Sequence, residues 1–164
     1  DVLEMEKMLN EYLQFASSSF KEKNENFNVT DLIKNIIKDF KKESIHSELT
    51  DEIYMNGKKN LIQRCINNLI NNSINYASKI HIQLKKSNNL IVIIVDDNGP
   101  GISKEEYENV FKPFYKIDKS RADAKSSVGL GLSIASDIIR SHGGNIVLDK
   151  SKMNGLSVKI FLPV

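Results

Sequence analysis

This sequence has little cysteine, little net charge and no long apolar run. Cys65 is the single cysteine, which excludes a disulfide framework and a cysteine-based metal site and is typical of a reducing compartment. The 23 basic and 21 acidic side chains leave a net charge of only +2. So small a charge creates no strong electrostatic field that would attract nucleic acid or an anionic membrane. No apolar run reaches bilayer-spanning length. We therefore expect a cytoplasmic domain with no nucleic-acid partner.

The first residues predict a helix followed by a linker. The chain starts at Asp1 with neither a leader nor an initiator Met, and we expect a fragment of a longer protein. Within 1–19, apolar residues at spacings of three and four make a narrow helical seam: Val2, Met5, Leu9, Tyr12 and Ala16. Such a seam suits a partner helix or, equally, packing on its own domain. The serines at 17–19 are expected to end the helix, 20–26 to form a polar linker, and 27–164 to form one globular domain.

Beyond the linker, helical and strand patterns mix without a strict βαβ order. Thr30 is the expected N-cap of the next helix, and Ile45–Met55 is expected to be extended. The remaining patterns predict helices at 58–76 and 130–141 and strands at 80–84, 90–95, 145–149 and 156–162, the first two strands forming a hairpin. These elements predict a layered sheet with helices on one face, after one N-terminal helix.

The strand pattern at 90–95 leads into the loop Asp97-Asn98-Gly99-Pro100-Gly101. A buried strand thus delivers the Asp97 carboxylate to its end, where it can accept a hydrogen bond from an exocyclic amine. The glycines let the backbone turn sharply and approach a flat ligand without an intervening Cβ. A second cluster, Gly129-Leu130-Gly131, opens a helix whose free N–H groups and dipole favour an anion such as a phosphate chain. The two clusters together predict a nucleotide pocket.

The helix at 58–76 carries a polar stripe beside its apolar one. Arg64, Asn68, Asn72 and Tyr76 recur every four residues and so share one slowly drifting face. An amide oxygen is a neutral, hard ligand that suits Mg²⁺, which takes few protein groups together with substrate phosphates. Asn72 is therefore the expected metal ligand. The chain is rich in asparagine throughout, so the spacing in isolation favours chance placement of these amides.

Together, these motifs resemble the catalytic, ATP-binding domain of sensor histidine kinases, most closely the EnvZ-like members. Four segments match the N, G1, F and G2 boxes of that family in order: Arg64–Tyr76, Asp97–Gly101, Phe111–Phe114 and Gly129–Leu132. Four ordered motifs are more specific than any one of them. The resemblance covers nearly the whole chain, including a final glycine motif at Gly155-Leu156-Ser157. It implies a Bergerat-type α/β (α+β) two-layer sandwich with a mixed sheet, and it implies that 1–19 ends a dimerisation and phosphoacceptor helix.

The resemblance also implies roles for individual residues. Asp97 would accept from the adenine amino group and so favour ATP over GTP. Asn72 would hold Mg²⁺, with Asn68 nearby on phosphate or water, and Tyr76 would lie along the base or ribose. Cations of a lid at 112–128 would close over the phosphates, which makes an implied catalytic set of Asn68, Asn72, Lys116 and Arg121. The other implied nucleotide-binding positions are Gly99, Gly101, Ile102, Phe114, Gly129, Leu130, Gly131 and Leu132.

The implied activity is transfer of the ATP γ-phosphoryl group to a histidine on a helical hairpin outside this chain. The full-length protein is then expected to be a membrane-anchored homodimer that serves a response regulator. Departures from the family pattern bear on nucleotide affinity and lid order: Asn75, Lys116 and Ser127. Two alternatives remain, an ATPase domain of the gyrase, Hsp90 and MutL type, which lacks this F box, and a degenerate nucleotide sensor. His46 falls in a predicted strand and is not expected to be a phosphoacceptor, His142 suits a helix C-terminus as a cation, and Cys65 is expected to be a core residue.

Overall fold

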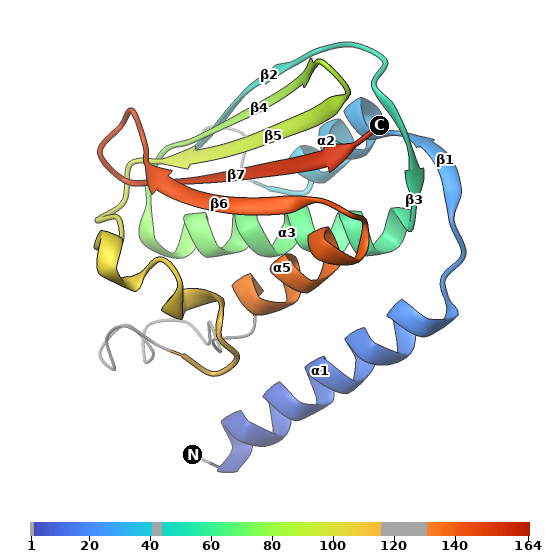
Figure 1. Cartoon of the computed structure of the whole chain (residues 1–164). Coiled ribbons are helices and arrows are strands. Elements are labelled where there is room, and N and C mark those ends of the chain that lie inside the picture. The colour runs from blue at the N-terminus through green and yellow to red at the C-terminus, as the bar shows by residue number, and fades with distance from the viewer. Residues whose placement is uncertain (1, 41–43, 116–130) are drawn as a thin grey trace.

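A computed structural model of the chain describes residues 2–40, 44–115 and 131–164. Its helices are α1 Val2–Lys21, α2 Val29–Lys38, α3 Lys59–Tyr76 and α5 Gly131–Ser141, with 3-10 turns η2 Lys104–Glu106 and η3 Asn109–Phe111. Its strands are β1 Glu25–Asn28, β2 Ile45–Leu49, β3 Tyr54–Gly57, β4 Ile80–Ser87, β5 Leu90–Asp97, β6 Asn145–Lys150 and β7 Leu156–Pro163. Five strands form a mixed sheet in the order β2-β4-β5-β7-β6, with β2 parallel to β4 and the other neighbours antiparallel (Figure 1). A second, antiparallel sheet pairs β1 with β3.

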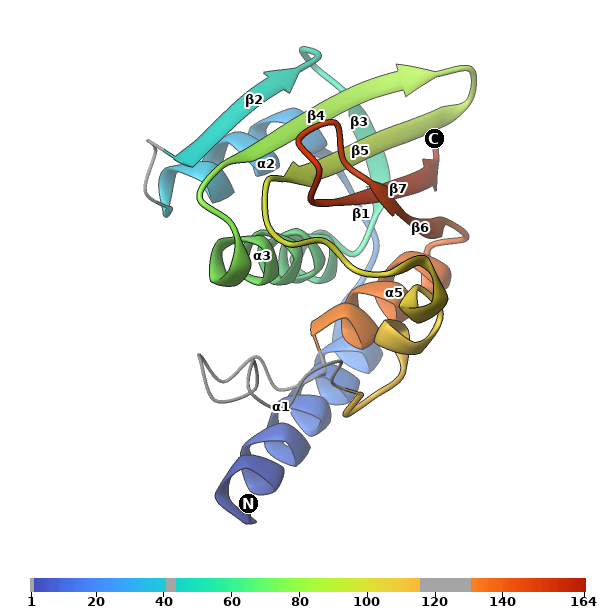
Figure 2. The same cartoon turned by 90° about the vertical axis from the view of Figure 1, so that its left-hand side faces the viewer.

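One face of the five-stranded sheet packs against α2, α3 and α5, as the two views of Figures 1 and 2 show. In β4 the side chains of Ile80, Ile82 and Leu84 are buried against these helices, while the alternate residues are more exposed. β5 lies in the centre of the sheet and is buried along most of its length. A sheet covered by helices on one face confirms the predicted two-layer α+β sandwich with one N-terminal helix.

The start of α2 differs from the prediction, because Asn28 rather than Thr30 is its N-cap. The Asn28 side chain accepts a hydrogen bond of 3.0 Å from a backbone N–H in the first turn. The Thr30 hydroxyl instead donates to Thr50 O (2.7 Å) and accepts from Ile53 N (3.2 Å). These bonds tie α2 to the segment between β2 and β3. The same segment divides Ile45–Met55, which the sequence predicts as one extended piece, into two strands of different sheets.

α1 continues through the serines at 17–19, so the helix break predicted there is wrong. Serine is only a moderate helix former, so a few long-range hydrogen bonds are enough to keep these serines helical. The last turn of a helix has carbonyls without partners inside the helix. Here the Lys58 ammonium group donates to Ser19 O at 2.7 Å, which satisfies one of those carbonyls. Contacts with a distant part of the chain therefore extend the helix beyond the limit that local composition predicts.

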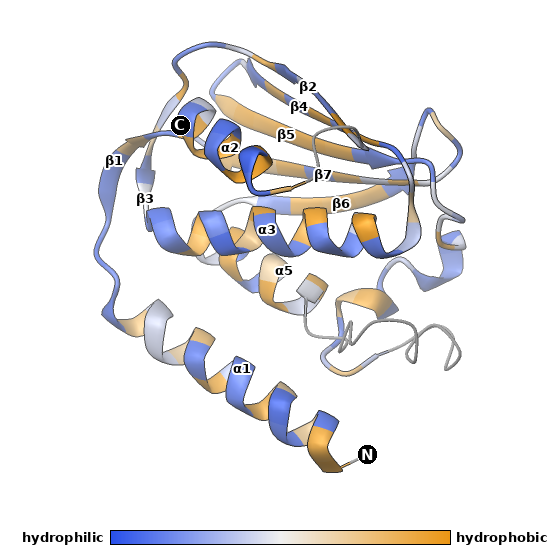
Figure 3. Cartoon of the chain, turned by 180° about the vertical axis from the view of Figure 1, so that it is seen from behind, coloured by the Kyte–Doolittle hydropathy of each residue, from blue (hydrophilic) through white to orange (hydrophobic). Residues whose placement is uncertain are grey.

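α1 lies beside the two layers rather than inside them (Figure 3). Met8 and Phe15 are its buried apolar residues among those described. Several others are at least 40% exposed: Val2, Leu3, Met5, Leu9, Tyr12, Leu13 and Phe20. The predicted seam is thus largely exposed, which contradicts its packing on this domain. No helix in the described part of the chain is both long and apolar enough to cross a membrane.

Candidate nucleotide site

Asp97 ends β5 with only 4% of its surface exposed. Its Oδ1 accepts hydrogen bonds from Gly99 N (2.9 Å) and Leu156 N (3.0 Å), and its backbone carbonyl accepts one from the Ser151 hydroxyl (2.5 Å). A buried carboxylate without donors would carry a large desolvation cost. Two backbone N–H groups offset that cost and fix the orientation of the carboxylate through Oδ1.

Three glycines let the backbone close around this carboxylate. A Cβ on Gly155 would lie 2.3 Å from both the backbone O and Oδ1 of Asp97, and a Cβ on Gly99 would lie 2.8 Å from Tyr76 O. Gly101 has a φ of +71°, in the region that favours glycine. The sequence predicts close backbone approach at Gly99 and Gly101. Gly155 must be glycine because β7 pairs with β5 and brings it against Asp97. The local sequence does not show that pairing.

Asn98 has a role that the sequence analysis did not assign. Its Oδ1 accepts from Ser78 N and Lys79 N, both at 2.9 Å, and its Nδ2 donates to Ser78 Oγ at 2.9 Å. Its backbone N also donates to Lys79 O at 3.2 Å. The Asn98 side chain therefore joins the loop after β5 to the turn between α3 and β4. The signal in the sequence is only the neighbouring Asp97, because the partners lie on another segment.

The polar stripe of α3 divides between two surroundings. Arg64 lies against α1, where it donates to Glu11 O (3.3 Å) and its Cζ is 5.8 Å from the ring centroid of Phe15. Asn68 and Asn72 are half-buried farther along the helix. Asn68 Nδ2 is a buried donor with no hydrogen-bond partner among the described residues. Such an atom is costly to leave unsatisfied, so a ligand oxygen fits there.

The donor set of the site suits a magnesium ion that is shared with a ligand. In the described segments, no group of three or more His, Cys, Asp or Glu side chains could hold a metal. A cage built from protein alone is thus not found in them. Mg²⁺ commonly keeps waters and binds phosphate oxygens with one or two protein groups, and the amide oxygen of Asn72 is compatible with that mode.

α5 begins at Gly131, packs against α3, and has first-turn N–H groups without partners inside the helix. A Cβ on Gly131 would meet no atom of the described residues within 4 Å, so packing against them does not require glycine there. Leu132 is half-buried and packs against the core. The other predicted site residues of this region lie outside the described residues: Lys116, Arg121, Gly129 and Leu130.

The aromatic segment before residue 116 packs unevenly. Phe111 and the predicted site residue Ile102 are half-buried against the core. Phe114 is 54% exposed and has a φ of 67°. The Tyr115 hydroxyl donates to the Glu106 carboxylate, and this hydrogen bond is the main cause that raises the pKa of Tyr115. The segment is thus anchored by Phe111 and Tyr115, while Phe114 remains at the surface.

His142 lies directly after α5, and the hydrogen bond at its Nε2 does not fit the cationic form that the sequence predicts. Its Nε2 accepts a hydrogen bond from Lys58 N (3.0 Å), which requires that this nitrogen carry no proton. Its Nδ1 lies 2.7 Å from Ile138 O and is the nitrogen that donates. His46 lies in β2, as the sequence predicts. Cys65 is fully buried, and desolvation raises the pKa of its thiol to about 12, which confirms it as a core residue.

Known proteins are similar to this chain in both sequence and fold. Residues 57–164 match the family described as histidine kinase-, DNA gyrase B- and HSP90-like ATPase. The chain is 35% identical over 109 residues to the sensor histidine kinase CpxA of Escherichia coli K12, which covers 66% of this chain and 24% of CpxA. It is 36% identical over 148 residues to the heme sensor protein HssS of Staphylococcus epidermidis, which covers 85% of this chain and 32% of HssS.

Solved structures agree with these relatives. The catalytic domain of the histidine kinase ThkA superimposes with a TM-score of 0.74 at 25% identity, over 86% of this chain and 95% of that one. The mycobacterial sensor histidine kinase MprB has the same fold, with a TM-score of 0.74 at 22% identity over 86% of this chain and 97% of that one. The chain therefore belongs to the histidine kinase-, DNA gyrase B- and HSP90-like ATPase family and, within it, to the catalytic ATP-binding domains of two-component sensor histidine kinases. It spans a quarter to a third of the length of the curated relatives, 24% of CpxA and 32% of HssS.

Proposed function

We propose that this chain binds ATP with the adenine against Asp97 and presents the γ-phosphoryl group to a histidine on a helical hairpin of the same protein. The observation that carries the proposal is the buried Asp97 carboxylate, held through Oδ1 by Gly99 N and Leu156 N. With Oδ1 engaged, Oδ2 is the oxygen that accepts from the adenine amino group. Guanine has a carbonyl at that position, so two acceptors would face each other, and ATP is preferred over GTP.

The amides of α3 and the start of α5 serve the phosphate end of the same ligand. A phosphate oxygen would give the buried Asn68 Nδ2 the acceptor it lacks among the described residues. Asn72 would hold Mg²⁺, which when bound neutralises phosphate charge. The free N–H groups and dipole at the start of α5 favour the same anion, with Gly129–Leu132 around it. Tyr76 would lie along the base or ribose, and the lid cations would be Lys116 and Arg121.

The remaining organisation follows from α1 and from the longer relatives. We assign α1, which extends the predicted 1–19 to Lys21, to the end of a dimerisation and phosphoacceptor helix, the short stretch between α1 and β1 to a linker, and the chain from β1 onward, predicted as 27–164, to the catalytic domain. The exposed apolar seam of α1 supports the assignment, because such a seam suits a second helix. The full-length protein would be a membrane-anchored homodimer that passes its phosphoryl group to a response regulator. The sensor kinase relatives favour this reading over an ATPase that drives conformational change.

Calorimetric titration with ATP and GTP, each with and without Mg²⁺, tests nucleotide recognition. We expect ATP to bind more tightly than GTP. Asp97→Asn should weaken ATP binding by about 10- to 100-fold, the size expected for a charge-assisted hydrogen bond. Ser141→Ala is the control, since Ser141 bonds only within its own helix and the residue that follows it among the described contacts. Equal affinities for the two nucleotides would contradict the role of Asp97.

A transfer assay then separates kinase from nucleotide sensor. The chain should form no phosphohistidine alone, and it should phosphorylate a supplied hairpin of the same protein when ATP and Mg²⁺ are present. Stable phosphohistidine on the isolated chain would contradict the proposal, because none of its described histidines lies in a phosphoacceptor helix. ATP binding without transfer to the hairpin would instead identify a nucleotide sensor.

A further inference from the structure

Ser151 follows β6 and lies at the centre of a compact hydrogen-bonded loop. It is 6% exposed, although its side chain is polar. Its hydroxyl donates to Asp97 O (2.5 Å) and accepts from Met153 N (3.1 Å) and Gly155 N (3.0 Å). Its backbone N donates to Gly155 O at 2.9 Å. A hydroxyl offers one donor and two acceptor positions, so Ser151 uses its full capacity here.

The loop at 151–155 brings this hydroxyl into the geometry of the Asp97 carboxylate. Ser151 holds both backbone groups of Gly155: the Ser151 hydroxyl accepts from Gly155 N, and Ser151 N donates to Gly155 O. Gly155 in turn lies directly against Asp97, where even a Cβ would come within 2.3 Å of Oδ1. The next residue, Leu156, supplies one of the two N–H groups that Oδ1 accepts. Ser151 is therefore joined to Asp97 twice, once through the Asp97 carbonyl and once through the start of β7.

We propose that Ser151 is a positioning residue for base selection, which aims the Asp97 carboxylate at the amino group of adenine. The proposal rests on the proposed function of Asp97. Without the hydroxyl, Gly155 N and Asp97 O each lose a partner in a buried place, and Met153 N loses one in a half-buried place. The start of β7 is then free to shift, Leu156 N moves relative to Oδ1, and the carboxylate loses its fixed orientation. A direction-dependent hydrogen bond to the base weakens, while contacts to the phosphates do not depend on this loop.

The test compares affinities for ATP and for inosine triphosphate, which has a carbonyl in place of the amino group. Ser151→Ala removes the hydroxyl, and Ser151→Cys replaces it with a thiol, which is a weaker donor and acceptor. Ser136→Ala is the matched control, because Ser136 is similarly buried (3% exposed) and lies on α5, away from this loop. Calorimetry gives the ratio of the two affinities for each protein, and circular dichroism checks that each variant is folded.

We expect the preference for ATP over inosine triphosphate to fall by about tenfold in Ser151→Ala, less in Ser151→Cys and not at all in Ser136→Ala. An unchanged ratio in folded Ser151 variants overturns the proposal, even if both affinities fall together, because that result indicates a general structural role. Unfolding of both Ser151 variants also overturns it. A wild-type protein that does not distinguish the two nucleotides would instead refute the proposed function of Asp97, so the two failures are distinguishable.

Discussion

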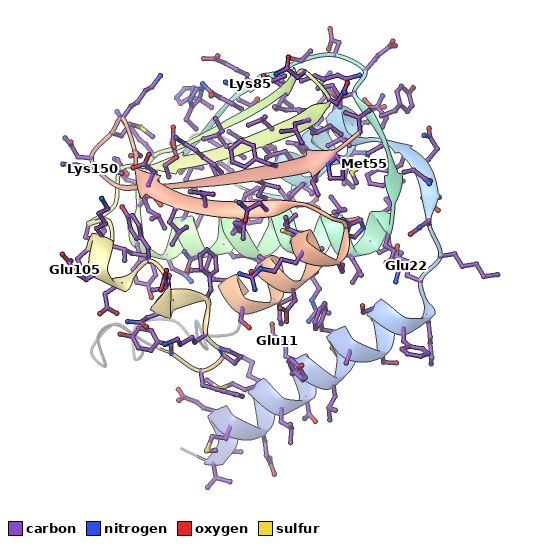
Figure 4. All side chains as sticks on the ribbon, viewed as in Figure 1. Glu11, Glu22, Met55, Lys85, Glu105 and Lys150 are labelled. Carbon is purple, nitrogen blue, oxygen red and sulfur yellow. The ribbon has the colours of Figure 1, made fainter. Side chains whose placement is uncertain are left out.

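The two ends of α3 are held in opposite ways. At its N-terminal end, side chains from distant segments satisfy the free N–H groups. Glu22, labelled in Figure 4, accepts from Asn60 N (2.7 Å) and Leu61 N (3.1 Å). His142 accepts from Lys58 N. At its C-terminal end, backbone meets backbone, with Tyr76 O against Gly99.

One end of α3 is therefore an anchoring point and the other is part of the site. Lys58, the N-cap residue of α3, makes no capping bond with its own side chain, so Glu22 provides the cap that the local sequence lacks. The same stretch of helix carries Arg64, which lies on Phe15 of α1. Farther along, the stripe turns to the unsatisfied amide of Asn68. One helix thus carries both the contact with α1 and the groups that suit the nucleotide, and the contrast between its ends can be tested by mutation.

The largest loss of stability and of ATP binding is expected for a change beside the C-terminal end of α3, which is part of the site. Gly155→Ala places a Cβ 2.3 Å from backbone and carboxylate atoms of Asp97, which cannot move without breaking the sheet or the loop. We expect a loss of roughly 1–3 kcal/mol or more in the free energy of unfolding, the cost of overpacking, together with loss of ATP binding. Urea denaturation measures the first and calorimetry the second. Gly131→Ala is the matched control for stability, because a Cβ there meets no atom in the described part of the chain within 4 Å. Equal destabilisation by the two changes would contradict the steric argument.

A smaller effect is expected at the anchoring end. Glu22→Ala removes both acceptors from the first turn of α3, and we expect a loss of about 1 kcal/mol in the free energy of unfolding, as for other N-caps. Because Glu22 directly follows α1, the change should also increase cleavage of α1 by a protease under native conditions. Glu6→Ala, on an exposed residue of α1, should change neither quantity. If Glu22→Ala reduced the free energy of ATP binding by more than the free energy of unfolding, the division of α3 into an anchoring end and a site end would be wrong.

The Arg64–Phe15 contact should contribute less to the free energy of unfolding than the Glu22 cap. A guanidinium near an aromatic ring at a partly exposed site contributes about 0.5–1 kcal/mol. A double-mutant cycle with Arg64→Gln and Phe15→Leu isolates that coupling, because Phe15 is also buried by other groups. We expect a coupling energy in this range from denaturation of the four proteins. A coupling energy of zero would show that the Arg64–Phe15 contact does not help to hold α1, which would then depend on apolar burial and on hydrogen bonds such as those of Glu22 and Lys58.

The sequence predicts well what depends on neighbouring residues. Period-two alternation identifies β4, and a continuous apolar run identifies β5 and leads to Asp97 at its end. Prediction from the sequence fails where a contact with a residue distant in the chain determines the local structure. The serines of α1 remain helical beside a contact with Lys58, and the same residue makes His142 an acceptor. Ser151 is a loop serine by composition, and two of its hydroxyl bonds stay within that loop, but its bond to Asp97 O requires the loop to be assembled beside β5.

The smallest expected effect concerns Cys65, in the middle of α3. It is a dependence of stability on pH that vanishes near neutral pH. Burial raises the pKa of Cys65 from its ordinary 9.0 to about 12, so the folded protein keeps the thiol protonated where the unfolded chain does not. The contribution to stability is fully present below about pH 9 and is lost as the pH rises toward about 12, with a slope of roughly 1.4 kcal/mol per pH unit. The difference in unfolding free energy between wild type and Cys65→Ala should therefore be constant near neutrality and shrink above about pH 9. Parallel curves throughout would mean that this stretch of α3, between its anchored end and its site end, is open to water.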